Sequence, residues 1–225
     1  SEKSLANEAV SKHLSQVPSR KFAPLMNQLT SRLQDTKEQF QTLLFGLVLR
    51  ICTEHPYHGM YQVYTGAVSE INHKDESSVS RRSAANKVSR QLDKSKSVGL
   101  IWTSLQTCNR LYSALARETN EQKYRSGRRI AIKDSIAATN LNNKLAKLGL
   151  PPSTMQIPLS STSDYSKLPR VVRLDPVIKI ASGVSAPKII IATANNGAKF
   201  TQLVSSHQAS VSRPGLQSTG KRRQR

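Results

Sequence analysis

The spacing of apolar residues changes along this chain, and that change limits the folds that it can adopt. Up to about residue 118, apolar residues recur three and four positions apart, as on one face of an amphipathic helix. From about residue 168, β-branched residues alternate with polar ones, as in strands. Gly149, Pro151, Pro152 and Pro158 separate the two patterns and disfavour a long helix there. The chain is therefore predicted to be an α+β protein, with stacked helices first and a partial antiparallel sheet after them.

Several apolar stripes predict helices in the first part. The clearest stripe contains Phe40, Leu43, Leu44, Leu47, Val48 and Ile51. Asp35 and Glu38 are spaced as in a capping box before it. That helix should end near His55, because Pro56 disfavours helical geometry in the residue before it. Further stripes lie at 22–33, 58–68 and 98–115, which together predict a helical-repeat arrangement.

The second part is predicted to contain four strands, at residues 171–174, 177–180, 188–194 and 199–204. Asn196-Gly197 predicts a type I′ hairpin turn with positive φ at both residues. A helix is expected around 135–148. Residues 205–225 lack periodicity and are predicted to form a disordered basic tail.

The charge is strongly basic, with 34 Lys and Arg against 14 Asp and Glu and a net charge of +20. Such a balance is typical of proteins that neutralise nucleic-acid phosphates. Many of these residues lie in Ser77–Lys96, Lys123–Lys133 and Lys221–Arg225, where few aromatic residues are available for base stacking. A polar linker with a basic tail is the preferred interpretation. A basic helical nucleic-acid-binding or scaffold protein remains the alternative.

Two cysteines and the lack of a signal-peptide pattern favour a reduced, intracellular protein. The longest apolar run, Leu43–Leu49, is too short to cross a bilayer. We therefore expect no membrane partner.

Catalytic and metal motifs are absent from the sequence. Cys52, His55 and His58 stand three apart, but zinc needs a fourth ligand, and Cys108 lies in another predicted helix. A structural role at a helix end is the preferred interpretation, and no metal site is assigned. No nucleophile elbow, Walker A motif or G-x-G-x-x-G motif occurs, so no catalytic residue is assigned either.

One turn between two predicted strands is a candidate anion site. It consists of Ser182, Gly183, Val184, Ser185, Ala186 and Pro187. Its backbone N–H groups could contact phosphate oxygens, and Lys188 at the start of the next strand could add a positive charge. A surface hairpin with an exposed lysine would show the same pattern.

Residues 168–204, above all Ser182–Ile190, resemble the beginning of the kinase domain of phosphatidylinositol-3-kinase-related protein kinases. Residues 151–155 resemble the segment that leads into that domain. Residues 20–29 and 51–57 are similar to the end of the helical FAT region of the same family. The resemblance covers most of residues 8–204 and fits the ATM branch best, in particular its fungal telomere-maintenance member.

The resemblance implies four regions. These are the end of a FAT-like helical region at 1–120, a helical linker at 121–150, the start of a kinase N-lobe at 151–204, and the tail at 205–225. It implies a serine/threonine protein kinase that uses ATP with Mg or Mn, with the 182–187 turn over the ATP phosphates and Lys188 in contact with them. The implied partners are protein substrates, a DNA-break-sensing complex with DNA ends indirectly, and a second copy of the full-length protein. The implied location is the nucleus, at chromosomes and telomeres.

The sequence departs from the family pattern after Val204. The family continues with Lys-Gly-x-Asp-Asp-Leu-Arg-Gln-Asp, whereas this chain has Ser205-Ser-His-Gln. Neither a catalytic-loop Asp with its Asn nor an Asp-Phe-Gly follows, and phosphoryl transfer depends on the metal ions and the base that these motifs supply. We therefore expect a fragment, either a truncated product or a mis-joined gene model, that is inactive by itself.

Overall fold

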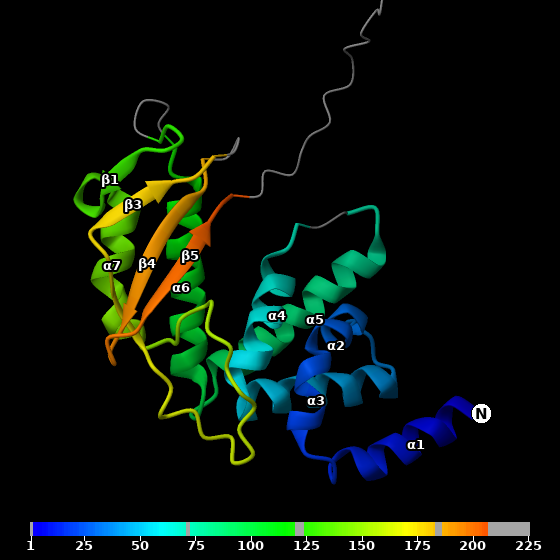
Figure 1. The fold of residues 1–225 in the computed structure, drawn as a ribbon. Coiled ribbons are helices and arrows are strands. Elements are labelled where there is room, and N and C mark those ends of the chain that lie inside the picture. The colour runs from blue at the N-terminus through cyan, green and yellow to red at the C-terminus, as the bar shows by residue number, and fades with distance from the viewer. Residues whose placement is uncertain (1, 71–72, 120–123, 183–185, 207–225) are drawn as a thin grey trace, which may run out of the picture.

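The computed structural model describes residues 2–70, 73–119, 124–182 and 186–206. A helical lobe lies beside a lobe in which two helices cover a sheet (Figure 1). The helices are α1 (Glu2–Leu14), α2 (Met26–Arg32), α3 (Gln39–Glu54), α4 (Pro56–Val68), α5 (Glu76–Asp93), α6 (Gly99–Arg117) and α7 (Ile136–Leu148). Short 3-10 turns occupy Ser19–Lys21, Ala23–Leu25 and Ile132–Asp134. Among the described helices, none combines the length and apolar character that crossing a membrane requires.

The sheet is antiparallel and is centred on one strand. Its strands are β1 (Arg129–Ala131), β2 (Val171–Leu174), β3 (Val177–Ile180), β4 (Lys188–Ala194) and β5 (Lys199–Val204). β3 pairs with the start of β4, β2 pairs with its end, and β5 pairs along its length. β1 adds to the free edge of β3. The four strands predicted from the sequence are confirmed.

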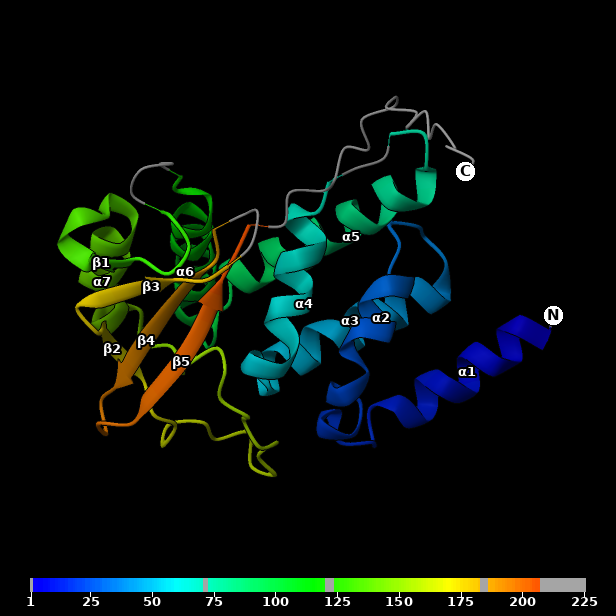
Figure 2. The ribbon, with the colours of Figure 1, turned by 45° about the horizontal axis from the view of Figure 1, so that its top comes forward.

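Two apolar cores hold the chain together, and α6 contributes to both. Trp102 and Leu105 of α6 are fully buried in the core of the helical lobe, where α6 packs against α4 and α5. Leu115, near the other end of α6, is buried beneath the sheet with Leu141 of α7 and Ile190 of β4. In Figure 2, α6 and α7 lie behind the sheet while α6 also borders the helical lobe. The helix therefore joins the two lobes.

The interpretation of Ser77–Lys96 as a solvated linker was wrong. Residues 76–93 form α5, and Asp75 caps its start by accepting a hydrogen bond from the Ser77 amide. The buried face of the helix consists of small and medium side chains, namely Ala84, Ala85, Val88, Ser89 and Leu92. Because Ala84, Ala85 and Ser89 are weakly apolar, the stripe was difficult to recognise among the charged residues of the exposed face.

The region predicted as a helical linker, 121–150, contains the expected helix and also a strand. α7 confirms the helix predicted around 135–148. Residues 129–131, however, form β1, in which Ile130 is buried opposite Ile178 of β3. Three residues are too few to show an alternating pattern, so the sequence did not predict this strand.

Two local details also differ from their predictions. Asp35 does not cap α3, which starts without a side-chain cap at Glu38. Asp35 instead accepts from Ser83 Oγ at 2.6 Å and pairs with Lys87, so it joins the start of α3 to α5. The β4–β5 turn is not type I′, since Gly197 has a φ of 82° while Asn196 has no positive φ. Most of the predicted tail lies outside the described residues.

Candidate nucleotide-phosphate site

The candidate turn connects β3 to β4 at one end of the sheet. Its middle residues, Gly183, Val184 and Ser185, lie outside the described residues. The base of the turn is closed by a hydrogen bond from the Ala181 amide to the Pro187 carbonyl at 2.8 Å. Ser182 is exposed, and Ala186 has a φ of 45°. The described residues on either side of the turn therefore lie between β3 and β4, while its three middle residues stay a prediction.

A second loop, residues 124–128, is hydrogen-bonded to the residues at the start of this turn. The Gly127 amide donates to the Ile180 carbonyl at 3.0 Å, and the Ile180 amide donates to the Arg128 carbonyl at 2.9 Å. The hydroxyl oxygens of Ser126 and Ser182 lie 3.0 Å apart. Sequence reasoning missed this loop because its position beside the turn depends on β1, which the sequence did not reveal.

Lys188 is fully buried on the face of the sheet that the helices cover. Its Nζ donates to the carbonyl oxygen of Ala116 at 3.2 Å and lies 4.7 Å from the centre of the Tyr124 ring. Ala116 belongs to the last turn of α6, whose carbonyl groups lack helical partners and carry the negative end of the helix dipole. The ammonium group therefore binds the end of a helix in this structure.

The surroundings of Lys188 affect its charge in opposite directions. Burial lowers the pKa of Lys188 below its ordinary value, while the carboxylate of Glu118 opposes that shift. Glu118 itself accepts from Ser135 Oγ at 2.7 Å and from the Ala137 amide at 3.1 Å at the start of α7. Burial raises the pKa of Tyr124 to about 12, so that its hydroxyl stays neutral. Lys188 is therefore bound to the end of α6 and interacts electrostatically with Glu118, which in turn binds the start of α7.

The residues considered as metal ligands take part in other contacts. His55 Nδ1 lies 2.7 Å from the Tyr165 hydroxyl, and His58 Nε2 lies 2.9 Å from the Ile157 carbonyl oxygen. Cys52 and Cys108 are buried free thiols whose pKa values burial raises to about 12 and about 11. Within the described ranges, no three His, Cys, Asp or Glu side chains gather as a metal site would require.

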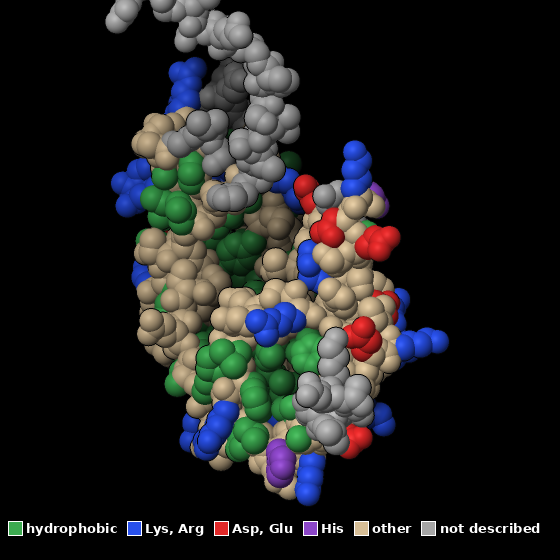
Figure 3. Space-filling model, turned by 90° about the vertical axis from the view of Figure 1, so that its right-hand side faces the viewer, with side chains coloured by type: hydrophobic (Ala, Val, Ile, Leu, Met, Phe, Trp, Pro, Cys, Tyr) green, Lys and Arg blue, Asp and Glu red, His purple; other side chains and the backbone are tan. Residues whose placement is uncertain are grey.

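The basic residues do not form one continuous patch on the face of the molecule shown in Figure 3. Lys and Arg side chains there are separated by acidic and uncharged ones. Within the helical lobe, Lys87 pairs with Asp35 and Arg81 with Asp75. The face therefore offers no specific support for the alternative of a nucleic-acid-binding protein.

No protein-family model matches the chain. Curated relatives do match. The serine/threonine-protein kinase TEL1 of Gibberella zeae is 50% identical over 204 residues, which cover 91% of this chain and 7% of the relative. The serine-protein kinase ATM of Sus scrofa is 31% identical over 212 residues, which cover 84% of this chain and 7% of the relative.

Solved structures match in fold as well. The structure described as the FAT and kinase domain of CtTel1 aligns with a TM-score of 0.83 and 44% identity, over 90% of this chain and 14% of the matched chain. The complete CtTel1 dimer with C2 symmetry aligns with a TM-score of 0.84 and 44% identity, over 91% of this chain and 7% of that chain. The chain thus spans about 7% of the length of the curated relatives. By sequence and by fold, it belongs to the Tel1/ATM branch of the phosphatidylinositol-3-kinase-related protein kinases.

Proposed function

We propose that this chain forms the junction between the FAT region and the first kinase strands in a Tel1/ATM-type serine/threonine protein kinase. In this proposal the chain contributes part of an ATP site to phosphoryl transfer onto protein serine or threonine. The observation that carries the proposal is the alignment of 90% of the chain, helices and sheet together, with a FAT and kinase domain structure. A helical scaffold alone would not account for the sheet and its β3–β4 turn.

The residue-level proposal concerns Ser182, Gly183, Val184, Ser185, Ala186, Pro187 and Lys188. The turn would supply backbone N–H groups to the ATP phosphates. Lys188 would supply its charge either directly, after release from Ala116, or through the turn that it follows. Because Lys188 is fully buried, direct contact requires its side chain to move.

ATP would be accompanied by Mg or Mn, which neutralise charge on the phosphates during transfer. Residues 151–225 contain two carboxylates, Asp164 and Asp175. Asp175 accepts from Thr193 and Lys199 at the far end of β4, away from the turn. In this proposal, therefore, neither the metal ligands nor the catalytic base come from the sheet of this chain.

The wider role that we propose is signalling of DNA breaks and telomere maintenance in the nucleus. The names of the Tel1 and ATM relatives support it. Its partners would be protein substrates and a break-sensing complex, with DNA ends approached indirectly. A homodimer of the full-length protein is supported by the alignment with a C2-symmetric CtTel1 dimer.

Calorimetry with Mg-ATP tests the proposal on this chain. Binding should be about millimolar or weaker, which corresponds to about 4 kcal/mol, because one turn and one lysine leave the adenine and most of the phosphate charge uncovered. Lys188→Met should abolish any binding that remains, whereas the exposed Lys199→Ala at the far end of β4 should not. Micromolar binding or protein phosphorylation by this chain alone would overturn the proposal that it supplies only part of the site.

A further inference from the structure

The linker between α7 and β2, residues 150–170, makes specific contacts that the proposed ATP site does not use. It runs from the sheet lobe toward the junction of α3 and α4 and back again (Figure 1). The Val171 amide donates to the Leu150 carbonyl at 2.9 Å, so the two ends of the linker meet. The excursion to the helical lobe therefore begins and ends at the edge of the sheet.

The first contact is made by His55, which lies between α3 and α4. Pro56 starts α4, and this fixes the sharp change of direction at His55. The imidazole is only 2% exposed, and its Nδ1 lies 2.7 Å from the hydroxyl of Tyr165 in the linker. The two rings are perpendicular, with centroids 6.0 Å apart. The same hydroxyl accepts from the Ser160 amide at 3.3 Å.

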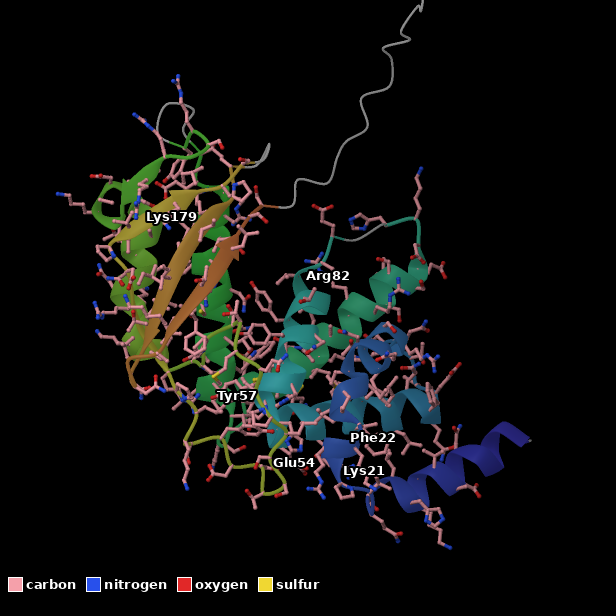
Figure 4. The ribbon with its side chains drawn as sticks, in the orientation of Figure 1. Lys21, Phe22, Glu54, Tyr57, Arg82 and Lys179 are labelled. Atoms are coloured by element: carbon pink, nitrogen blue, oxygen red, sulfur yellow. The ribbon has the colours of Figure 1, made fainter. Side chains whose placement is uncertain are left out.

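The second contact joins Tyr57 to Arg170 at the end of the linker. Figure 4 shows Tyr57 where α4 faces the linker. Arg170 donates through Nη1 to the Tyr57 hydroxyl and through Nη2 to the Tyr165 carbonyl at 2.8 Å. Its guanidinium carbon also lies 5.3 Å from the centre of the Tyr57 ring, within the range of a cation–π interaction. Tyr57 and Tyr165 pack edge to face at 5.7 Å.

Arg170 continues these contacts into the sheet. Its amide donates to Asn195 Oδ1 at 3.0 Å, and the Asn195 amide donates back to the Arg170 carbonyl at 2.8 Å. Asn195 follows the last residue of β4, the strand that begins at Lys188. An unbroken series of contacts therefore leads from the α3–α4 junction to one end of β4, while the candidate turn lies at its other end.

We infer that His55, Tyr57, Tyr165 and Arg170, here termed the linker clamp, set the orientation of the sheet relative to the helical lobe. Tyr57 also packs against the core of the helical lobe, and α6 contributes to both cores, so the clamp adds a second connection between the lobes on the side of the linker. Its positioning of the sheet is independent of ATP. Any effect of the clamp on the placement of the 182–187 turn matters for ATP only if the proposed function is correct.

The inference can be tested by measuring distances between the lobes of the full chain with paired spin labels. Lys94 at the end of α5 and Lys179 on β3 are both exposed and can be replaced by labelled cysteines. Cys52 and Cys108 are buried, which keeps background labelling low. The unaltered clamp should give one narrow distance distribution by double electron–electron resonance.

Arg170→Ala should broaden that distribution at least about twofold, and Arg170→Lys should restore it only in part, because lysine lacks the planar fork. Arg173→Ala, at an exposed position of β2, is the matched control and should leave it narrow. If Arg170→Ala does not fold, the same distances are measured in Tyr57→Phe, which removes only the hydroxyl that Arg170 binds and should also broaden the distribution. An unchanged distribution in a folded Arg170→Ala or Tyr57→Phe variant would overturn the inference.

These outcomes are separable from the test of ATP binding. If the unaltered chain binds Mg-ATP at micromolar concentration or phosphorylates protein, but Arg170→Ala broadens the distances, the proposed partial ATP site is wrong and the clamp stands. If ATP behaves as proposed and the distances do not change, the clamp is wrong and the ATP role stands.

Discussion

Replacing Lys188 by alanine removes the charged side chain that joins the start of β4 to the end of α6. The side chain is fully buried and its ammonium donates to the Ala116 carbonyl. If Lys188 instead faced solvent to meet ATP, its removal would barely change the stability of the unliganded chain. The stability of the variant therefore distinguishes a structural anchor from an exposed ligand.

The magnitude follows from three contributions. Truncation to alanine removes three buried methylene groups, at about 0.8 kcal/mol each. It also removes a hydrogen bond from a charged donor, which contributes about 1.5–3 kcal/mol. Relief of the desolvation that lowers the pKa of Lys188 offsets part of this loss. We expect a net loss of about 2–4 kcal/mol in the free energy of unfolding for Lys188→Ala. Lys188→Met keeps the apolar stem, so it should lose only about 1–2 kcal/mol.

The assay is urea unfolding followed by circular dichroism, with hydrogen exchange to locate the change. Exchange should rise first in β4 and at the end of α6, on either side of the lost hydrogen bond. Lys199→Ala, in which an exposed ion pair with Asp175 is broken, is the control and should cost less than about 1 kcal/mol. If Lys188→Ala and Lys199→Ala unfold at the same urea concentration as the unaltered chain, the buried-anchor argument is refuted.

Three further predictions concern the helical lobe, whose core holds Trp102 as a fluorescent reporter. Leu44→Ala should cost about 2–5 kcal/mol in urea unfolding because Leu44 is buried, and an unchanged midpoint would contradict its packing. Burial lowers the pKa of His55 below 6.5, so the unfolded chain gains a proton first and stability should fall as the pH drops below about 6.5. A flat profile from about pH 8 to about pH 5 would exclude this effect. Cys52 and Cys108 should react with a thiol reagent only on unfolding, and rapid reaction of the folded chain would show that they are accessible.

The parts of the fold that could be predicted are those in which local pattern and tertiary packing agree. Strong apolar stripes at helical spacing predicted α3 and α6. Alternation of apolar and polar residues predicted four strands with the observed bounds. α5 was missed because its buried face relies on Ala84 and Ala85, which pack closely but score as weakly apolar. β1 was missed because three residues acquire strand geometry only through pairing with β3.

In the candidate site, too, the features set by local sequence could be predicted, and those set by tertiary packing could not. The turn after β3 follows from glycine, proline and the flanking strands, and so it was predicted. The burial of Lys188 could not be predicted, because a lysine at the start of a strand is usually exposed. Only the folded chain shows that this position faces the end of α6, where the Ala116 carbonyl accepts a hydrogen bond from the ammonium group. The pairing of Tyr57 with Arg170 likewise joins residues that are 113 positions apart.

The central claim is that this chain is a working segment of a Tel1/ATM-type kinase, and a chimera tests it most directly. Residues 8–204 would replace the matching segment of full-length TEL1 from Gibberella zeae, which is 50% identical in this region. We predict that the purified chimera phosphorylates a protein substrate at a rate within about tenfold of the parent kinase, whereas this chain alone transfers no phosphate. A chimera that folds and binds its partners but has lost all kinase activity would contradict the claim.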